Sequence, residues 1–270
     1  MSLHASICIY QTDFNEASHV VDLLQRSRVV EHISVMDNSE TETPAYRDMP
    51  ITYVFMNRNV GYGSAHNVAM RESINADADY HLVINCDVDF NPDDLRVMVH
   101  YMDSHPDVGI LTPRFVDTHG QWQASCHLLP TPFDLIGRRF LPKAWINKRN
   151  SHYELRETGL DHIINAPYLV GAFMLIRVNA LRQAGLFDER FFMYPEDIDI
   201  TRRIHRHYRT LYYPDVTIMH EGAHGSYHSM HLLHVHIVNM IRYFNKWGWI
   251  IDRERVAFNR QVISETQDIT

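Results

Sequence analysis

The sequence predicts an α/β fold in which helices flank a mainly parallel sheet. Short apolar runs rich in Val, Ile and aromatic residues alternate with longer stretches whose apolar residues recur at helical spacing. Polar turns containing Gly, Asn or Asp separate the two kinds of segment. This order is typical of βαβ units, in which strands lie parallel and ligands bind beyond their carboxyl ends. The chemistry is therefore expected just after the strands.

The first third of the chain contains four predicted strands. Each is an apolar run that ends at a polar or Gly-containing turn, and they cover residues 5–10, 32–36, 52–56 and 80–85. Two helices connect them: 14–26, which is amphipathic, and a second helix that follows the turn 57–63 and ends at residue 74. A further helix is predicted over 93–104, because an Asn-Pro pair precedes it as a start signal.

The middle of the chain is less regular. Residues 113–165 are rich in Pro, Arg and aromatic residues and are predicted to form a long loop with short elements. Beyond this region the apolar run 168–176 predicts a buried strand, and a short helix over 179–184 ends where a glycine follows. A helix over 196–207 then leads into a strand over 210–219.

A C-terminal helix is predicted over 231–251, where apolar residues recur at helical spacing. These residues are Leu233, Ile237, Met240, Ile241, Phe244, Trp247 and Ile251. The helix either packs on the rest of the chain or lies on a membrane surface. The chain therefore divides into residues 1–226, which hold the α/β domain, and 227–270, a C-terminal helical extension.

Composition excludes several classes of protein. The chain has 270 residues, enough to bury a large core, and its net charge of -8 gives no basic face for nucleic acid. Three cysteines far apart in the sequence (Cys8, Cys86 and Cys126) form no disulfide framework or Cys-based zinc site. No signal peptide or membrane-spanning run is expected. We therefore expect a cytoplasmic protein, with peripheral contact at the inner face of the cell membrane as the alternative.

Two carboxylates follow the predicted strand 80–85. In an extended chain, residues two apart point to the same side, so Asp87 and Asp89 are expected to converge on one cation. Hard oxygen ligands suit Mg²⁺ or Mn²⁺, which neutralise a diphosphate. The alternative is a solvated acidic turn. The position at the end of an apolar strand favours the metal site.

Two other segments carry candidate site residues. The run from Asn59 to Asn67 either cradles a phosphate at a helix N-terminus or is a structural turn. Farther on, Glu196, Asp197 and Asp199 begin a helix. Asp199 is assigned to favourable helix-dipole charge, whereas a general base requires a carboxylate beside a reactive hydroxyl. The helix N-terminus is expected to keep Asp197 ionised at neutral pH.

The segment MHEGAHGS contains His-Glu-x-x-His, the spacing of a zinc protease. That motif works only on a helix, where His220 and His224 share one face. Here His220 ends a predicted strand, and the glycines that follow it disfavour a helix. A zinc hydrolase is therefore improbable. His220 is either a third ligand of a divalent metal or a histidine satisfied at the end of its strand, with His224 the weaker candidate.

In this order and spacing, seven segments resemble the family 2 glycosyltransferases with the GT-A (Rossmann-like) fold, closest to bacterial rhamnosyltransferase-like members. The segments are VMDNSE, NRNVGYGSAHN, LVINCDVDFNPDDL, HPDVGILTPRFVD, LVGAFMLIR, GLFDERFFMYPEDIDITRRI and MHEGAHGS. The likeness runs from about residue 6 to residue 226. Two departures are Cys86, where a proline is frequent, and Gln11-Thr12, where many members have Tyr-Asn. The second departure leaves the identity of the nucleotide open.

The resemblance implies roles for particular residues. Asp197 is implied to be the catalytic base, with Glu196 as the competing candidate. Asp87 and Asp89 are implied to hold the metal and the sugar diphosphate, and a histidine such as His220 reaches that metal in several members. Residues implied to bind the nucleotide-sugar donor are Gln11, Asp37 (at the base), Asn59, Gly61, Asn67 and Asp87.

The predicted function is that of an inverting hexosyltransferase that depends on a divalent cation, Mg²⁺ or Mn²⁺. By resemblance, the first candidate donor is dTDP-L-rhamnose. The expected acceptor is a growing bacterial cell-envelope polysaccharide, such as an O-antigen, or a lipid-linked oligosaccharide beside residues 231–251. The alternative is a nucleotide-sugar-binding protein without turnover, which the intact Glu196-Asp197 pair disfavours.

Overall fold

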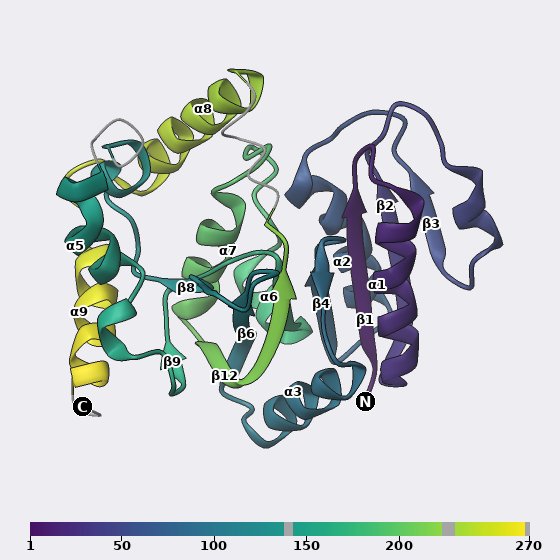
Figure 1. Cartoon of the computed structure of the whole chain (residues 1–270), viewed down its shortest axis with the longest axis horizontal. Coiled ribbons are helices and arrows are strands. Elements are labelled where there is room, and N and C mark those ends of the chain that lie inside the picture. The colour runs from purple at the N-terminus through teal and green to yellow at the C-terminus, as the bar shows by residue number, and fades with distance from the viewer. Residues whose placement is uncertain (138–142, 223–229, 268–270) are drawn as a thin grey trace.

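The computed structural model describes residues 1–137, 143–222 and 230–267. Within these ranges ten strands form one sheet with the order β3-β2-β1-β4-β11-β6-β12-β5, where β7 pairs with β6 and β9 with β12 (Figure 1). A separate pair joins β8 and β10. The strands are β1 (Leu3–Ile9), β2 (Val30–Asp37), β3 (Thr52–Phe55), β4 (Tyr80–Ile84), β5 (Val88–Asp89), β6 (Val108–Val116), β7 (Trp122–Gln123), β8 (Cys126–His127), β9 (Ile164–Asn165), β10 (Tyr168–Leu169), β11 (Phe173–Arg177) and β12 (Arg209–His220).

The first four strands and the β6–β12 pair are parallel, whereas β11 runs antiparallel to both β4 and β6. The predicted α/β fold with a mainly parallel sheet is confirmed. The helices are α1 (Phe14–Ser27), α2 (Tyr62–Asn75), α3 (Pro92–Ser104), α5 (Lys143–Tyr153), α6 (Val178–Ala184), α7 (Glu196–His205), α8 (Met230–Trp247) and α9 (Arg253–Gln267).

Local signals account for the helix starts that the sequence predicts. The Asp13 side chain caps α1 by accepting from the Asn15 amide at 2.8 Å, and the Asn91 side chain caps α3 by accepting from the Asp93 amide at 3.2 Å. The apolar face of α1 then packs on the sheet. Its buried residues include Ala17, Val20, Val21, Leu23 and Leu24.

Two strand predictions are wrong. The run 168–176 is not one strand, because the chain turns around Gly171, so that β10 pairs with β8 while β11 enters the main sheet. The region 113–165 begins inside β6, a strand that the sequence analysis missed. Pro113 lowers the strand propensity of that segment, and in the structure it faces Tyr213 just before a register shift in β12, where the ladder is already irregular.

The C-terminal helices pack on the rest of the chain. On α8, Tyr243 and Phe244 are fully buried against Phe191 and Ile198, and Val262 of α9 belongs to the same apolar cluster as Ile204 of α7. The predicted helix 231–251 ends earlier, at Trp247, and α9 was not predicted. None of the helices in the described part of the chain is long and apolar enough to cross a membrane.

A buried ion pair ties α7 to the turn between α8 and α9. The Arg202 side chain, 1% exposed, donates to both Asp252 oxygens at 2.8 and 2.6 Å and to Glu254 at 2.7 Å. Its guanidinium also lies 4.0 Å from the centre of the Trp247 ring. Because the charges are out of water, removing one partner leaves the other uncompensated.

We expect Arg202→Met to lower the free energy of unfolding by about 3–5 kcal/mol, because the buried Asp252 carboxylate would lose both short contacts to Arg202 and keep only Arg255, at 3.9 Å. The measurement is equilibrium urea denaturation. The control is Arg206→Met, since Arg206 pairs with Glu254 at 2.6 Å but has a side chain that is 43% exposed. The control should lose less than about 1 kcal/mol. Equal losses in the two variants would contradict the assigned role of the ion pair.

Candidate active site

An open cavity of about 470 Å³ lies at the edge of the sheet where β4 and β12 end. Parts of the chain far apart in sequence meet there: the turn after β4, β7, the turn between β10 and β11, the start of α7 and the end of β12. The lining residues are Tyr62, Asn85, Asp87, Gln123, Tyr168, Val170, Gly171, Ala172, Met193, Tyr194, Glu196, Asp197, His220 and Gly222. The cavity is therefore at the position predicted for an α/β sheet.

Two adjacent carboxylates, Glu196 and Asp197, reach the cavity while remaining 5% and 9% exposed. Asp197 accepts hydrogen bonds from the Gly171 amide at 3.1 Å and the Ile198 amide at 2.7 Å. Burial raises the pKa of Asp197 to about 7, and these hydrogen bonds and one from Tyr168 oppose that rise only in part. A pKa near the working pH suits a general base.

Burial works against the expectation that the helix N-terminus keeps Asp197 ionised at neutral pH, because desolvation raises its pKa more than the favourable amides lower it. Glu196 is shifted in the same direction. Burial, followed by the charge of Asp197, raises the pKa of Glu196 well above its ordinary value. The buried Oε2 atom of Glu196 has no hydrogen-bond partner within the described residues. Of the two, Asp197 is the one whose carboxylate accepts hydrogen bonds from the Gly171 and Ile198 amides, which favour its ionised form.

Asp87 and His220 meet on another wall of the cavity. The antiparallel pairing of β5 with β12 places His220 beside Val88, and His220 Nε2 lies 3.5 Å from Asp87 Oδ2. The other ring nitrogen, Nδ1, lies 3.1 Å from Gln123 Oε1, which fixes the orientation of the imidazole. Because His220 belongs to a strand, it does not start a protease helix. His224 lies outside the described residues.

Asp89 lies elsewhere. Asp87 is in a turn rather than in extended chain, so the alternation expected for residues two apart does not apply to this pair. The Asp89 carboxylate lies 3.2 Å from His19 Nε2 at an exposed position outside the cavity lining. A shared metal contact of Asp87 and Asp89 stays a prediction, and it requires Asp89 to leave His19.

The donor set at Asp87 and His220 fits a divalent cation that is shared with a substrate. One carboxylate and one imidazole are too few for a closed protein cage, and no group of three His, Cys, Asp or Glu residues suited to a metal occurs in the ranges that the structure describes. Mg²⁺ and Mn²⁺ in such sites take their remaining ligands from phosphates and water. The residues present therefore fit the predicted cation.

A second hollow, of about 330 Å³, lies beyond the ends of β1 and β2. Its lining includes Gln11, whose amide donates to Ser39 Oγ at 2.8 Å. Asp37, predicted to contact the base, is fully buried and accepts from the Ser39 amide at 2.8 Å and from the Tyr53 hydroxyl at 2.6 Å. Asp37 thus supports the wall of this hollow, and its direct contact with a base stays a prediction.

The segment from Asn59 to Asn67 has a structural role. The Asn59 side chain accepts from the Gly61 amide at 3.0 Å, and the Tyr62 amide donates to the Phe192 carbonyl at 3.0 Å, so two amides of the predicted phosphate cradle are already used. Asn67 is buried and exchanges hydrogen bonds with the Phe187 backbone at 2.9 and 3.0 Å. A donor contact by Asn67 stays a prediction.

Several residues that line the cavity of Asp87 and Asp197 (the candidate catalytic cavity) were not predicted from the sequence. The Tyr62 hydroxyl donates to Asn85 at 2.8 Å and to the Gly171 carbonyl at 2.9 Å, which connects α2 to two strand ends. Gln123 belongs to the region 113–165, which was predicted to be irregular. Tyr194 has a φ of 92°, which no sequence pattern predicted. For Tyr62 there was a signal, because it lies inside the Gly-containing turn already singled out.

Two relatives resemble the chain in sequence. The N-acetylglucosaminyl-diphospho-decaprenol L-rhamnosyltransferase of Mycobacterium tuberculosis is 28% identical over 183 residues, covering 62% of this chain and 58% of that protein. The low-salt glycan biosynthesis hexosyltransferase Agl10 of Haloferax volcanii is 24% identical over 207 residues, covering 74% of this chain and 62% of that protein. The chain thus spans less than two thirds of the length of either relative.

Two solved structures share the fold. GalNAc-T7 with UDP, GalNAc and Mn²⁺ matches with a TM-score of 0.58 and 11% identity, covering 81% of this chain and 43% of that one. The mannosyltransferase of Pyrobaculum calidifontis with GDP-Man and Mn²⁺ matches with a TM-score of 0.56 and 16% identity, covering 99% of this chain and 75% of that one. At these identities the likeness establishes the GT-A fold and nothing further.

The family comparison covers the chain from α1 into α8, which includes β2 to β12 and the cavity described above, but not β1 or α9. The model named "Glycosyltransferase like family 2" matches residues 12–244, a range that contains Asp87, Glu196, Asp197 and His220. Together with the GT-A fold, this match shows that the chain belongs to the family 2 glycosyltransferases.

Proposed function

We propose that the chain is an inverting, metal-dependent glycosyltransferase that moves a sugar from a nucleotide-diphosphate donor to an acceptor hydroxyl. One observation carries the proposal: a single cavity presents a buried carboxylate with a pKa of about 7 (Asp197) and a carboxylate–imidazole pair (Asp87 and His220). A base for the acceptor and a site for a diphosphate are the two parts that this reaction needs. Family membership supports the same reading.

In the proposed reaction, ionised Asp197 takes the proton from the acceptor hydroxyl. The acceptor oxygen forms a bond with the anomeric carbon on the face opposite the nucleotide, while the bond from that carbon to the phosphate oxygen breaks. The nucleoside diphosphate leaves with the bonding electrons. The hydrogen bonds from Gly171 and Ile198 hold the Asp197 carboxylate in place throughout.

Asp87 and His220 would hold the cation together with the diphosphate of the donor, and Gln123 keeps the imidazole oriented. When bound, a divalent cation neutralises the negative charge that accumulates on the departing diphosphate. The site fits a divalent cation because the Asp87 carboxylate and the His220 imidazole offer an oxygen and a nitrogen as metal ligands.

We propose dTDP-L-rhamnose as donor and a diphospho-lipid-linked sugar of a bacterial cell-envelope polysaccharide as acceptor. The name of the Mycobacterium tuberculosis relative describes an L-rhamnosyltransferase with such an acceptor, and its match covers 62% of this chain. The hollow beside Gln11 and Ser39, beyond β1 and β2, is the proposed place of the nucleotide base.

We expect dTDP-L-rhamnose with Mn²⁺ to raise the melting temperature of the wild-type protein, because a ligand that binds only the native state stabilises it. Asp87→Asn should lose this metal-dependent shift, since it removes the charge that faces the cation. The measurement is a thermal-shift assay with Mn²⁺ and with EDTA. The control is Asp93→Asn, an exposed acid at the start of α3, which should keep the full shift. A full shift in Asp87→Asn would contradict the metal site.

The proposed membrane contact of residues 231–251 falls on the turn after α8. Ile250 and Ile251 are 88% and 82% exposed, with Trp249 beside them at 38%. Aliphatic side chains next to a Trp are typical of interfacial anchors. Lys246, in contrast, is bonded to Asp188 and Asp199 and contributes to the fold.

We expect Ile250→Ser combined with Ile251→Ser to reduce co-sedimentation of the protein with phosphatidylglycerol-containing vesicles, because the two changes remove the exposed apolar surface. Val97→Ser is the matched control, since Val97 is an apolar residue on α3 that is 47% exposed. Equal sedimentation of the double variant and the wild type would contradict a membrane contact at this turn.

A further inference from the structure

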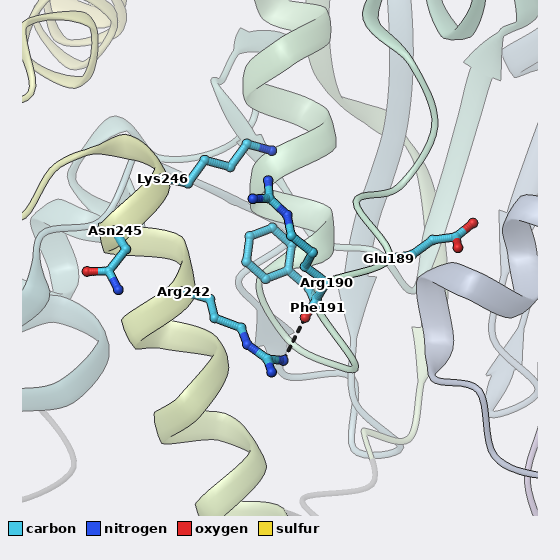
Figure 2. Close-up of a pocket in the computed structure, with 6 residues that line it drawn as sticks. All are labelled: Glu189, Arg190, Phe191, Arg242, Asn245 and Lys246. Atoms are coloured by element: carbon cyan, nitrogen blue, oxygen red, sulfur yellow. Dashed lines mark hydrogen bonds between the residues drawn. The ribbon is translucent and has the colours of Figure 1, made fainter.

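A second large cavity, of about 510 Å³, lies between α8 and the segment before α7 (Figure 2). None of its lining residues lines the catalytic cavity. Its walls are Glu189, Arg190 and Phe191 on one side and Arg242, Asn245 and Lys246 on the other. In Figure 2, Arg242 and Lys246 extend from α8 toward the facing segment, whereas Glu189 points away from them.

Positive charge exceeds negative charge around this cavity. Asp188 is shared by Arg190, at 2.5 Å, and Lys246, at 2.7 Å, and Asp199 is shared by Lys246 at 2.6 Å and Arg203 at 2.8 Å. The Glu189 carboxylate forms an ion pair with Arg71 on α2.

Arg242 adds a further cation to this group. It donates to the Arg190 carbonyl at 2.7 Å, and within the described residues no carboxylate lies within ion-pair distance of it. With the Arg71–Glu189 pair included, five cations therefore accompany three carboxylates at and behind this cavity, in a chain whose net charge is -8.

The cationic groups are already ordered. Lys246 Nζ lies 5.7 Å from the centre of the buried Phe191 ring, and the Arg242 guanidinium also donates to Asn239 Oδ1 at 3.1 Å. The hydrogen bonds from Arg190 and Lys246 hold the pKa of Asp188 well below its ordinary value, so this carboxylate stays ionised and keeps both cations in place. Because little side-chain freedom remains to be lost, an anion binds here at a reduced entropic cost.

The segment from Glu189 to Tyr194 contributes to both cavities, and one face of α8 packs against it. Asn239 donates to the Met193 carbonyl at 3.0 Å, and the His236 ring packs on the Tyr194 ring at 4.9 Å. Tyr194 and Met193 line the catalytic cavity. From His236, which packs on Tyr194, to Arg242 the helix advances about 9 Å.

We propose that Arg190, Arg242 and Lys246 form the subsite for the diphosphate of the acceptor, while the acceptor sugar lies at Asp197. This inference rests on the proposed function, because it needs an acceptor with a diphosphate. Guanidinium groups match phosphate oxygens in charge and geometry. The diphosphate of the donor belongs to the other cavity, with Asp87 and His220.

The test uses inorganic pyrophosphate as probe, titrated calorimetrically into the full chain with EDTA present, so that the donor site has no cation. Arg190→Gln combined with Arg242→Gln should weaken pyrophosphate binding at least about tenfold, because two charge-assisted contacts are lost. Arg253→Gln combined with Arg260→Gln, which removes two exposed arginines of α9, should leave it unchanged. Arg242→Lys, which keeps the charge, should bind better than Arg242→Gln.

Four outcomes would overturn the subsite: unchanged affinity in the Arg190/Arg242 double variant, loss of pyrophosphate binding in Asp87→Asn, inorganic phosphate binding as tightly as pyrophosphate, or loss of vesicle binding alone in the double variant. The last outcome would assign the arginines to lipid headgroups. The metal-dependent thermal shift with dTDP-L-rhamnose should be equal in the double variant and the wild type. No such shift in the wild type would count against the proposed function, whereas the pyrophosphate result tests the subsite alone.

Discussion

The site depends on how closely the chain from Phe187 to Asp197 packs against two glycines. A Cβ atom on Gly61 would lie 2.6 Å from the Phe192 carbonyl oxygen, and one on Gly171 would lie 3.1 Å from the Cβ atom of Asp197. The Gly61 contact is too short for a larger residue without a shift of the backbone, and a larger residue at Gly171 would require Asp197 to move by a few tenths of an ångström. Because they hold this segment against α2 and the β10–β11 turn, the two carboxylates at the start of α7 are buried at the edge of the sheet. A looser fit would expose Asp197 and return its pKa toward the ordinary range of an aspartate.

Burying two adjacent carboxylates destabilises the native state, and the surrounding contacts offset that cost only in part. Amides from Gly171 and Ile198 stabilise the charged form of Asp197. Tyr194, which precedes the two carboxylates in the chain, adopts a φ of 92°, a conformation that a bulky side chain rarely takes. Backbone strain of this kind persists only where the surrounding structure over-determines it. Here α8 supplies that constraint through the bond from Asn239 to Met193 and the packing of His236 on Tyr194. The C-terminal helices therefore shape the catalytic cavity as well as covering the domain.

The sequence predicted the parts of the structure that depend on local pattern. Strands β1 to β4 and their helices follow from apolar periodicity and turn residues, and the resemblance pointed to Asp197 before its surroundings were known. The predictions that failed concerned features that depend on long-range contacts. β6 was missed because Pro113 interrupts its apolar run, and no local pattern shows that β12 would accommodate it by a register shift. Asp89 was predicted to lie beside Asp87 because side chains alternate in extended chain, but Asp87 lies in a turn, where that alternation does not hold. The burial that raises the pKa of Asp197 arises from segments more than a hundred residues apart, such as Tyr62 and Gly171.

The central claim is that Asp197 is the base, and the pH dependence of turnover tests it most directly. Because burial places the pKa of Asp197 at about 7 and the ionised form is the active one, wild-type turnover should rise as the pH increases through that value and then level off. Asp197→Asn should lower turnover roughly 10²- to 10⁴-fold and abolish that rise, while metal-dependent donor binding survives. Glu196→Gln should keep the rise, since the proposed base is Asp197 and Glu196 takes no part in the proton transfer. Normal turnover in Asp197→Asn, with an inactive Glu196→Gln, would move the role to Glu196, and full activity in both variants would contradict the mechanism.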